Sequence, residues 1–337
     1  MALLTYFRTH PFSLNLALAI CLGLVMFVGL FLGYAPVGIA DATQGLLGIG
    51  EEQYVFIIQD IRVPRIVLGA LVGGCLGTAG AALQGLLRNP LADPGVIGIS
   101  SSAGLGAVIA IYFGLSSVYA FSVPALAILF AIGSMFILVW LAGRDASILT
   151  LILAGVAISS LAVSLTSLAM NLAPNPYSLS DIVMWLLGSL SNRSYADLAL
   201  SGPFMAAGLL LLFGSARNLP ALTLGEDTAA SLGVNLGRLR LQVIFGSALS
   251  VGASVAICGT VSFIGLIAPH LVRPLTQHDP GRLLLPSGLL GALILVVADI
   301  AVRIAPGAIE LKLGVVTALL GAPFFLWLII YTRRSMR

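Results

Sequence analysis

Long apolar stretches, separated by short polar or proline-containing breaks, dominate the sequence. Because a helix needs ~20 mostly apolar residues to cross the hydrocarbon core of a bilayer, each stretch is a candidate transmembrane helix. Nine spans are expected, at residues 14–34, 63–87, 96–113, 120–141, 148–170, 198–213, 241–260, 283–302 and 313–331. A further stretch, 263–277, is short and interrupted by proline, so the pattern predicts nine spans without it and ten with it.

The composition agrees with a membrane protein. Of the 337 residues, 59% are hydrophobic and 9% are charged, whereas a soluble domain carries roughly 25% charged residues. So few charges cannot cover a surface that faces water, which excludes a soluble enzyme, a disordered chain and a free nucleic-acid-binding protein. The net charge of +3 is too small to indicate a polyanionic partner.

The positions of the basic residues decide between nine and ten spans. Cytoplasmic loops of membrane proteins are enriched in Lys and Arg. Ten spans with a cytoplasmic N-terminus place eleven basic residues inside, at Arg8, Arg88, Arg144, Arg217, Arg238, Arg240, Arg273, Arg282, Arg333, Arg334 and Arg337. The five outside are Arg62, Arg65, Arg193, Arg303 and Lys312. Nine spans would put the basic C-terminal residues outside, so we predict ten spans, with both termini in the cytoplasm.

Residues that could catalyse a reaction or bind a nucleotide, a metal or haem are scarce. The single lysine, Lys312, lies between two leucines, so the chain has no phosphate-binding loop of the Gly-Lys-Ser/Thr type. Cys21, Cys75 and Cys258 stand far apart in apolar stretches and are expected to be buried structural thiols. His270 follows a proline in an apolar setting, where a hydrogen-bonded structural role is favoured over haem binding. We therefore expect no catalytic residue, no metal site and no cofactor in this chain.

Two breaks between the spans stand out. Residues 88–95 contain two prolines and an asparagine, so the backbone must leave helical geometry there, in an ordinary turn or beside a water-filled path. Residues 215–242 are polar and include Glu226-Asp227, which suit the first turn of a helix, and Gly233, which suits its end. The sequence predicts a short cytoplasmic helix that docks another protein, or a solvated connector.

Glycines recur within the spans, as at Gly73, Gly74, Gly77 and Gly80. In lipid, helices associate by close packing, which small residues permit. The expected fold is therefore an all-α, compact bundle of about ten transmembrane helices that forms a single permease domain over residues 1–337.

Six motifs, spread in order over nearly the whole chain, point to a family. They are residues 62–65 (RVPR), 84–98 (Gln84 and RNPLADPGVIG), 153–157 (LAGVA), 224–233 (LGE and LG), 263–270 (FIGLIAPH) and 314–323 (GVVTA and GAP). With these motifs the chain closely resembles the integral-membrane permeases of ATP-binding-cassette (ABC) importers for iron chelates, haem and vitamin B12.

The resemblance implies a vitamin-B12-permease-like bundle with short broken helices, in the bacterial inner membrane. It implies a homodimer around a central pathway, two separate ATPase subunits that bind ATP and Mg, and a periplasmic binding protein that delivers cargo. An iron chelate (haem or a ferric siderophore) is the expected cargo, with vitamin B12 as the alternative. An ion-coupled transporter is disfavoured because nearly every acidic residue lies at a membrane boundary, with Asp299 the arguable case.

The resemblance also assigns roles to single residues. The positions that would dock the ATPase are Gly225, Glu226, Asp227, Leu232 and Gly233. The positions that would bind carboxylates of the binding protein are Arg62, Arg65 and Arg303, for which an interfacial anchor is the alternative. The inner gate would include Asn89, Leu91, Ile148 and Leu149. Relatives can carry small hydroxyl residues at the last two positions, so a hydrophobic constriction is expected instead.

Overall fold

A computed structural model describes residues 11–119, 121–143, 147–305 and 310–335. Every regular element in these ranges is helical. The first half of the chain forms α2 (Pro11–Phe31), α3 (Ile39–Leu46), α4 (Glu52–Phe56), the π-helix η1 (Ile57–Arg62), α5 (Val63–Leu86), α6 (Ile99–Tyr112), α7 (Leu115–Val118), α8 (Ser122–Ala142) and α9 (Ile148–Asn171). The second half forms α10 (Pro176–Leu186), α11 (Tyr195–Gly214), η2 (Leu219–Leu224), α12 (Glu226–Ser231), α13 (Leu236–Cys258), α14 (Ile264–Val272), η3 (Arg273–Thr276), α15 (Pro280–Ile304) and α16 (Leu313–Ser335).

The bundle confirms the expected fold class. Seven helical stretches in the described ranges are long and apolar enough to cross a membrane, and α6 and the Leu313–Leu328 part of α16 are shorter apolar helical stretches. α14, at nine residues, is the short broken element expected near 263–277. The expected span 96–113 is shorter than predicted because Gly98, with φ of 85°, delays the start of α6 to Ile99. The second span is longer than predicted, since α4 and η1 extend it to 35 residues.

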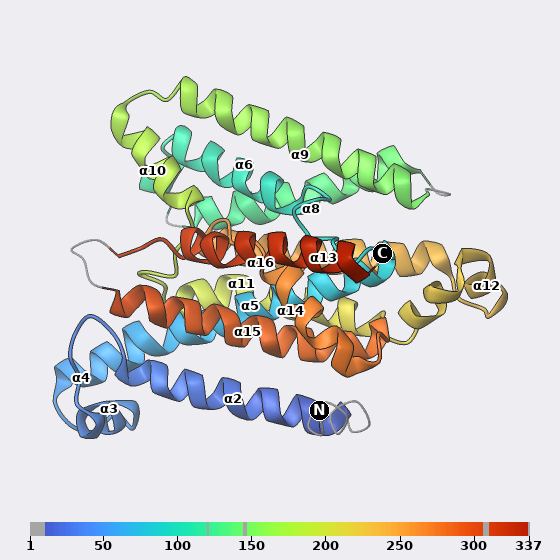
Figure 1. Ribbon diagram of the computed structural model, residues 1–337. Coiled ribbons are helices and arrows are strands. Elements are labelled where there is room, and N and C mark those ends of the chain that lie inside the picture. Colours follow the sequence, from blue (N-terminus) through green and yellow to red (C-terminus); the bar gives the residue numbers. More distant parts are fainter. Residues whose placement is uncertain (1–10, 120, 144–146, 306–309, 336–337) are drawn as a thin grey trace.

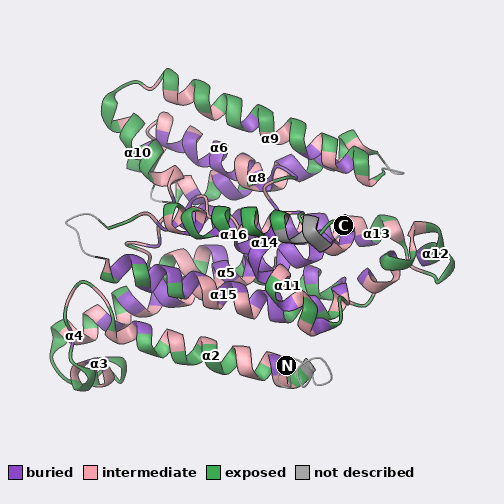
Figure 2. Ribbon diagram, in the orientation of Figure 1, coloured by how far each residue is buried: buried purple, intermediate pink, exposed green. Residues whose placement is uncertain are grey.

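The core lies along three helices. Within the most apolar window of each span, 78% of residues are buried in the span that contains α5, 78% in α13 and 67% in α15. The corresponding values are 11% for α2 and 22% for α9 (Figure 2). Cys75 and Cys258 are buried as expected, whereas the expectation was wrong for Cys21, which is exposed because α2 lies at the edge of the bundle.

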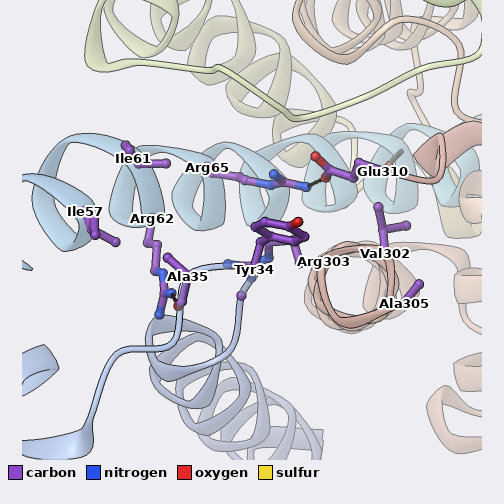
Figure 3. A pocket seen from close by; sticks show the side chains of 11 residues that line it. Tyr34, Ala35, Ile57, Ile61, Arg62, Arg65, Val302, Arg303, Ala305 and Glu310 are labelled. Carbon is purple, nitrogen blue, oxygen red and sulfur yellow. Dashed lines mark hydrogen bonds and ion pairs between the residues drawn. The ribbon is translucent and has the colours of Figure 1, made fainter. Parts of the chain in front are cut away.

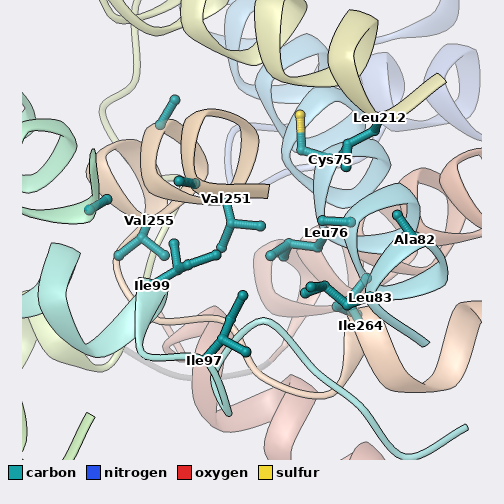
Figure 4. Close-up of a cluster of buried hydrophobic side chains, with 14 of the residues drawn as sticks. Cys75, Leu76, Ala82, Leu83, Ile97, Ile99, Leu212, Val251, Val255 and Ile264 are labelled. Atoms are coloured by element: carbon teal, nitrogen blue, oxygen red, sulfur yellow. The ribbon is translucent and has the colours of Figure 1, made fainter. Parts of the chain in front are cut away.

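Side chains from α5, α13 and α14 meet in the centre of the bundle. Leu76 and Leu83 of α5 lie near Val251 of α13 and Ile264 of α14. Ile97, in the turn between α5 and α6, lies beside them (Figure 4). All five residues are buried. The turn at residues 88–98 is therefore attached to the core at its C-terminal end, beside α14.

Glycines bring the central helices into backbone contact. A Cβ added at Gly77 would lie 2.2 Å from the carbonyl oxygen of Ser287 on α15. One added at Gly80 would collide with the backbone of Gly265 on α14, and one added at Gly73 would lie 2.3 Å from the carbonyl oxygen of Gly291. The close packing expected from these glycines is present, and it fixes α14 and α15 against α5.

The two ends of the bundle carry different elements. Figure 1 shows α12 at the same end as the first turn of α2 and the last turn of α16, with α3 and α4 at the opposite end. We call these the α12 end and the α3 end. This arrangement is the one that ten crossings require, although Arg8, Arg144 and Arg337 of the orientation argument lie outside the described residues. That the α12 end faces the cytoplasm stays a prediction.

Candidate functional site

Three arginines meet in one pocket at the α3 end. Arg62 ends the π-helix η1, Arg65 lies in the first turn of α5, and Arg303 lies in the last turn of α15. They line a pocket of about 430 Å³ together with Tyr34 and Glu310 (Figure 3). A π-helix is rare and occurs often at functional sites. The sequence predicted that these arginines share one side of the membrane, and the fold brings all three together.

Each arginine is held by contacts within the chain. The Arg62 guanidinium donates hydrogen bonds to the carbonyl oxygens of Leu30 at 2.6 Å and Ala35 at 2.5 Å. Arg303 donates to the carbonyl oxygens of Gly29 at 3.2 Å and Leu32 at 3.3 Å. The three arginines are 4–9% exposed. An interfacial anchor keeps its charged end in water, so these buried head groups do not fit that alternative, and a docking partner would have to reach into the pocket.

Two carboxylates complete the cluster. Asp299 accepts hydrogen bonds from Arg65 Nε at 3.0 Å and Nη2 at 2.8 Å, and lies 3.2 Å from Arg303 Nε. Glu310 pairs with Arg65 and accepts a hydrogen bond from Ser191 Oγ at 2.6 Å. Nothing in the sequence pattern indicated Glu310. Asp299 was expected only as an arguable proton carrier, although the spacing of Asp299 and Arg303, one helical turn apart, favours an ion pair.

The cluster carries one more positive than negative charge. Its members are three guanidinium groups and two carboxylates, and Arg303 Nη2 is a buried donor without a hydrogen-bond partner among the described residues. Burial alone would raise the pKa of Glu310, but hydrogen bonds from Arg65 and Ser191, with the charges of Arg65 and Lys312, hold that pKa below its usual value. Glu310 is therefore ionised at neutral pH, and the described cluster keeps one surplus positive charge.

The predicted short helix is present at the α12 end. Gly225, with φ of 101°, precedes α12, and Gly233, with φ of 87°, follows it. The amide of Ala229 donates to the Gly225 carbonyl at 3.0 Å, and the amide of Val234 donates to the Ala229 carbonyl at 3.0 Å. Both glycines adopt backbone conformations that other residues rarely take. The expected start and end of this helix are confirmed.

One of the two acidic residues of α12 that were expected to dock a partner, Glu226, is already paired within the chain. The Glu226 carboxylate accepts a hydrogen bond from Arg240 of α13 at 2.9 Å, so it ties α12 to the bundle. Asp227 is exposed, and Leu224 and Leu232 are 62% and 63% exposed. An acidic residue flanked by exposed leucines is the part of this element that a partner can contact.

The expected gate residues lie at the α12 end. Ile148 and Leu149, in the first turn of α9, line a pocket with Leu87, Arg88 and Ile152. Asn89 and Leu91 are exposed beside it, in a turn where the Asn89 side chain accepts a hydrogen bond from the Leu91 amide at 2.9 Å. The expected pair on α9 therefore lies next to the expected Asn-Pro turn. Arg88, expected only as a basic residue on the cytoplasmic side, also lines this pocket, and its φ of 47° turns the chain out of α5.

Besides these pockets, an open groove runs along α16 toward the α3 end. Leu187, Thr260 and Gly314 line a pocket of about 480 Å³ that continues along α16 to Pro323. Its wall is built from backbone hydrogen bonds, because the amides of Leu313 and Gly314 donate to the carbonyls of Gly188 at 2.9 Å and Leu187 at 3.1 Å.

His270 lies on α14 and packs edge-on against Phe324 of α16, with ring centroids 6.0 Å apart. Its Nδ1 is buried without a hydrogen-bond partner among the described residues. The expectation of a hydrogen-bonded histidine is therefore not met at this nitrogen.

The chain is similar in sequence to permease proteins of known import systems. The chain is 41% identical over 290 residues to the vitamin B12 import system permease protein BtuC of Vibrio cholerae, covering 85% of each chain. It is 37% identical over 284 residues to the Fe(3+) dicitrate transport system permease protein FecD of Escherichia coli, covering 84% of this chain and 88% of that one.

A solved structure described as an inward-facing metal-chelate type ABC transporter matches with a TM-score of 0.85 and 30% identity, over 95% of this chain and 99% of that one. The sequence pattern of the FecCD transport family matches residues 20–331. The chain is thus a multi-pass membrane protein that belongs to the FecCD transport family.

Proposed function

We propose that this chain is the permease subunit of an ABC importer that carries an iron chelate, haem or a ferric siderophore, across the bacterial inner membrane. A homodimer would enclose the path, a periplasmic binding protein would deliver the cargo, and two separate ATPase subunits would supply the energy. The observation that carries the proposal is the arginine pocket at the α3 end, with a surplus positive charge and a buried unpaired donor, opposite the exposed α12.

The arginine pocket suits a carboxylate of a binding protein. Guanidinium groups bind carboxylates through paired, charge-assisted hydrogen bonds. A glutamate from a protein outside the membrane can supply a carboxylate to this pocket, where Arg303 Nη2 has no hydrogen-bond partner among the described residues. Because the pocket is recessed, recognition would need an acidic side chain that projects from the surface of the partner.

The α12 end suits an ATPase. α12 projects from the bundle beyond α13 (Figure 1), and it offers Asp227 and Leu232 while the pair of Glu226 with Arg240 holds it in place. A rigid, exposed helix can pass movement of an ATPase into α13, which lies in the core. The nucleotide and Mg would bind to the ATPase subunits.

The homodimer is supported by α9 and α16. α9 buries only Leu151, Gly155 and Ala162 among its 24 residues, and the open groove along α16 is largely apolar. Both helices therefore present apolar faces that a second copy, the cargo path or lipid must cover. The gate residues Ile148 and Leu149 on α9 would then meet their counterparts near the dimer axis.

The structure disfavours ion coupling at Asp299. A proton carrier must bind and release its proton during transport, whereas Asp299 is 2% exposed and ion-paired with both Arg65 and Arg303. The cargo rests on the relatives: one carries ferric dicitrate and another vitamin B12. Vitamin B12 is therefore the second candidate.

The test is transport by the permease in vesicles, together with its cognate binding protein and ATPase, defined as those encoded beside it. Uptake of ferric siderophore, haem or cobalamin should require ATP and stop with an inactive ATPase. Titration of the binding protein with each of the three compounds identifies the cargo. Uptake driven by a proton gradient without ATP would refute the proposal.

Two pairs of variants test the docking faces. Arg62→Glu and Arg65→Glu should weaken binding of the binding protein, and more so at low salt. Asp227→Lys should weaken co-purification of the ATPase, with Asp41→Lys at the α3 end as its control. Unchanged binding in the first pair, or unchanged assembly in the second, would remove that face from the proposal.

A further inference from the structure

Glu310 differs from the other charged residues of the arginine pocket. The Asp299 side chain is 2% exposed and paired on two sides, whereas the Glu310 side chain is 35% exposed and reaches the pocket from its rim (Figure 3). We propose that Glu310 is an internal substitute for the partner's carboxylate: it holds Arg65 in the resting permease and leaves when an acidic side chain of the binding protein enters. This inference rests on the proposed docking at the arginine pocket.

Arg65 is arranged so that one of its two carboxylates can leave. Its Nε and Nη2 both donate to Asp299, and Nη2 also donates to Glu310. When Glu310 departs, Arg65 therefore stays fixed in place by Asp299, with one side of its guanidinium vacated. The vacated side of the guanidinium is complementary to a carboxylate in shape and in charge, so it selects an acidic partner.

The net charge of the pocket is the same before and after such an exchange. The resting pocket holds three positive and two negative groups, so departure of Glu310 raises its net charge from +1 to +2, and entry of one carboxylate restores +1. An internal carboxylate also avoids exposing a concentrated positive charge in the absence of the partner. The cost is competition, because the partner must displace Glu310 before it gains full contact with Arg65.

Glu310 also connects the pocket to the groove along α16. It lies three residues before Leu313, whose amide donates to the Gly188 carbonyl at 2.9 Å. Its second contact, from Ser191 Oγ at 2.6 Å, ties it to the chain that follows Gly188. Release of Glu310 removes this side-chain tie between the start of α16 and residues 188–191, so docking outside would loosen the wall of the groove.

The experiment measures affinity between the cognate binding protein and the permease in lipid nanodiscs at physiological salt. Glu310→Gln removes the competitor, so binding should tighten about fivefold, the factor by which an ion pair of ordinary strength lowers the competent population. Glu52→Gln, which removes an exposed negative charge from α4 at the same end, is the control for general attraction and should change affinity by less than about twofold.

A second, milder variant keeps the inference testable if Glu310→Gln fails to fold. Ser191→Ala keeps the Glu310 charge but removes one of its hydrogen bonds, so it should tighten binding by a smaller factor. A merely structural role for Glu310 predicts weaker binding in both variants. Unchanged or weaker binding in both, while Arg65→Glu still abolishes binding, would overturn the inference and leave the docking site intact. An Arg65→Glu variant with normal affinity would instead refute the docking site itself.

Discussion

The contact between α5 and α15 makes a quantitative prediction at Gly77. A Cβ at this position would lie 2.2 Å from the Ser287 carbonyl oxygen and 2.9 Å from its carbonyl carbon. Both are backbone atoms, so no side chain can rotate away to relieve the clash. The two helices must separate by roughly 1 Å before the contact becomes ordinary, because the interior of a protein is close-packed.

The size of the effect follows from two opposing terms. Overpacking of this kind costs typically about 1–3 kcal/mol, and separation also weakens the neighbouring contact of Gly73 with Gly291. Alanine regains about 1 kcal/mol over glycine in a helix interior. Gly77→Ala should therefore lower the free energy of unfolding by about 0–2 kcal/mol, and should be less stable than the equivalent change at an uncrowded glycine by the whole overpacking cost of about 1–3 kcal/mol.

Gly74 provides a matched control in the same helix. A Cβ there would have one neighbour, the Gly288 carbonyl oxygen at 3.8 Å, which is ordinary contact. Gly74→Ala should be neutral or stabilising by up to about 1 kcal/mol. Unfolding by SDS in mixed micelles, followed by tryptophan fluorescence, measures both variants. Equal stability of the two variants would refute the backbone contact between α5 and α15.

Three further predictions address the ends of the bundle. Arg240→Gln should release Glu226 and weaken co-purification of the ATPase several-fold, whereas Arg238→Gln, at an exposed position of the same turn, should not. Asn235→Ala removes the side-chain cap of α13, which accepts from the Arg238 amide at 2.9 Å, and should cost about 0.5–2 kcal/mol in an SDS titration, with Asn235→Asp retaining the stability. Because the pKa of Glu310 is lowered, its ion pair stabilises the protein above the ordinary glutamate pKa of about 4.3 and is lost as pH falls through the lowered value. Thermal unfolding of wild type and Glu310→Gln should therefore differ by a constant amount from about pH 8 to about pH 5 and converge at lower pH, and a difference that persists in acid would contradict the pairing.

Much of the bundle could be predicted from the sequence because the signals are local. Apolar length predicted the spans, and Gly225 and Gly233 marked the two ends of α12. The span expected at 241–260 begins earlier, at Leu236, because Asn235 caps the helix and its first turns extend beyond the apolar stretch. Polar residues such as Arg238 conceal this turn from any criterion based on hydropathy.

The arginine pocket could be predicted only in part. The RVPR motif indicated Arg62 and Arg65, but the π-helical turn that carries Arg62 has no sequence signature. Arg65 and Asp299 are 234 residues apart in the sequence, so their pairing depends on how α5 packs against α15. Glu310 lies in a connecting segment, where nothing local indicates that its carboxylate reaches Arg65.

The helices differ in how much of their surface is buried inside the protein. They therefore differ in how freely their residues can be substituted without loss of folding. α5, α13 and α15 bury most of their side chains inside the bundle, while α9 commits only three of its 24 residues to the chain's own interior. Exchanges of one apolar residue for another along the outward face of α9 therefore leave the folding free energy of the protomer nearly unchanged. A lineage can therefore change that face by single steps, each of which yields a properly folded protein.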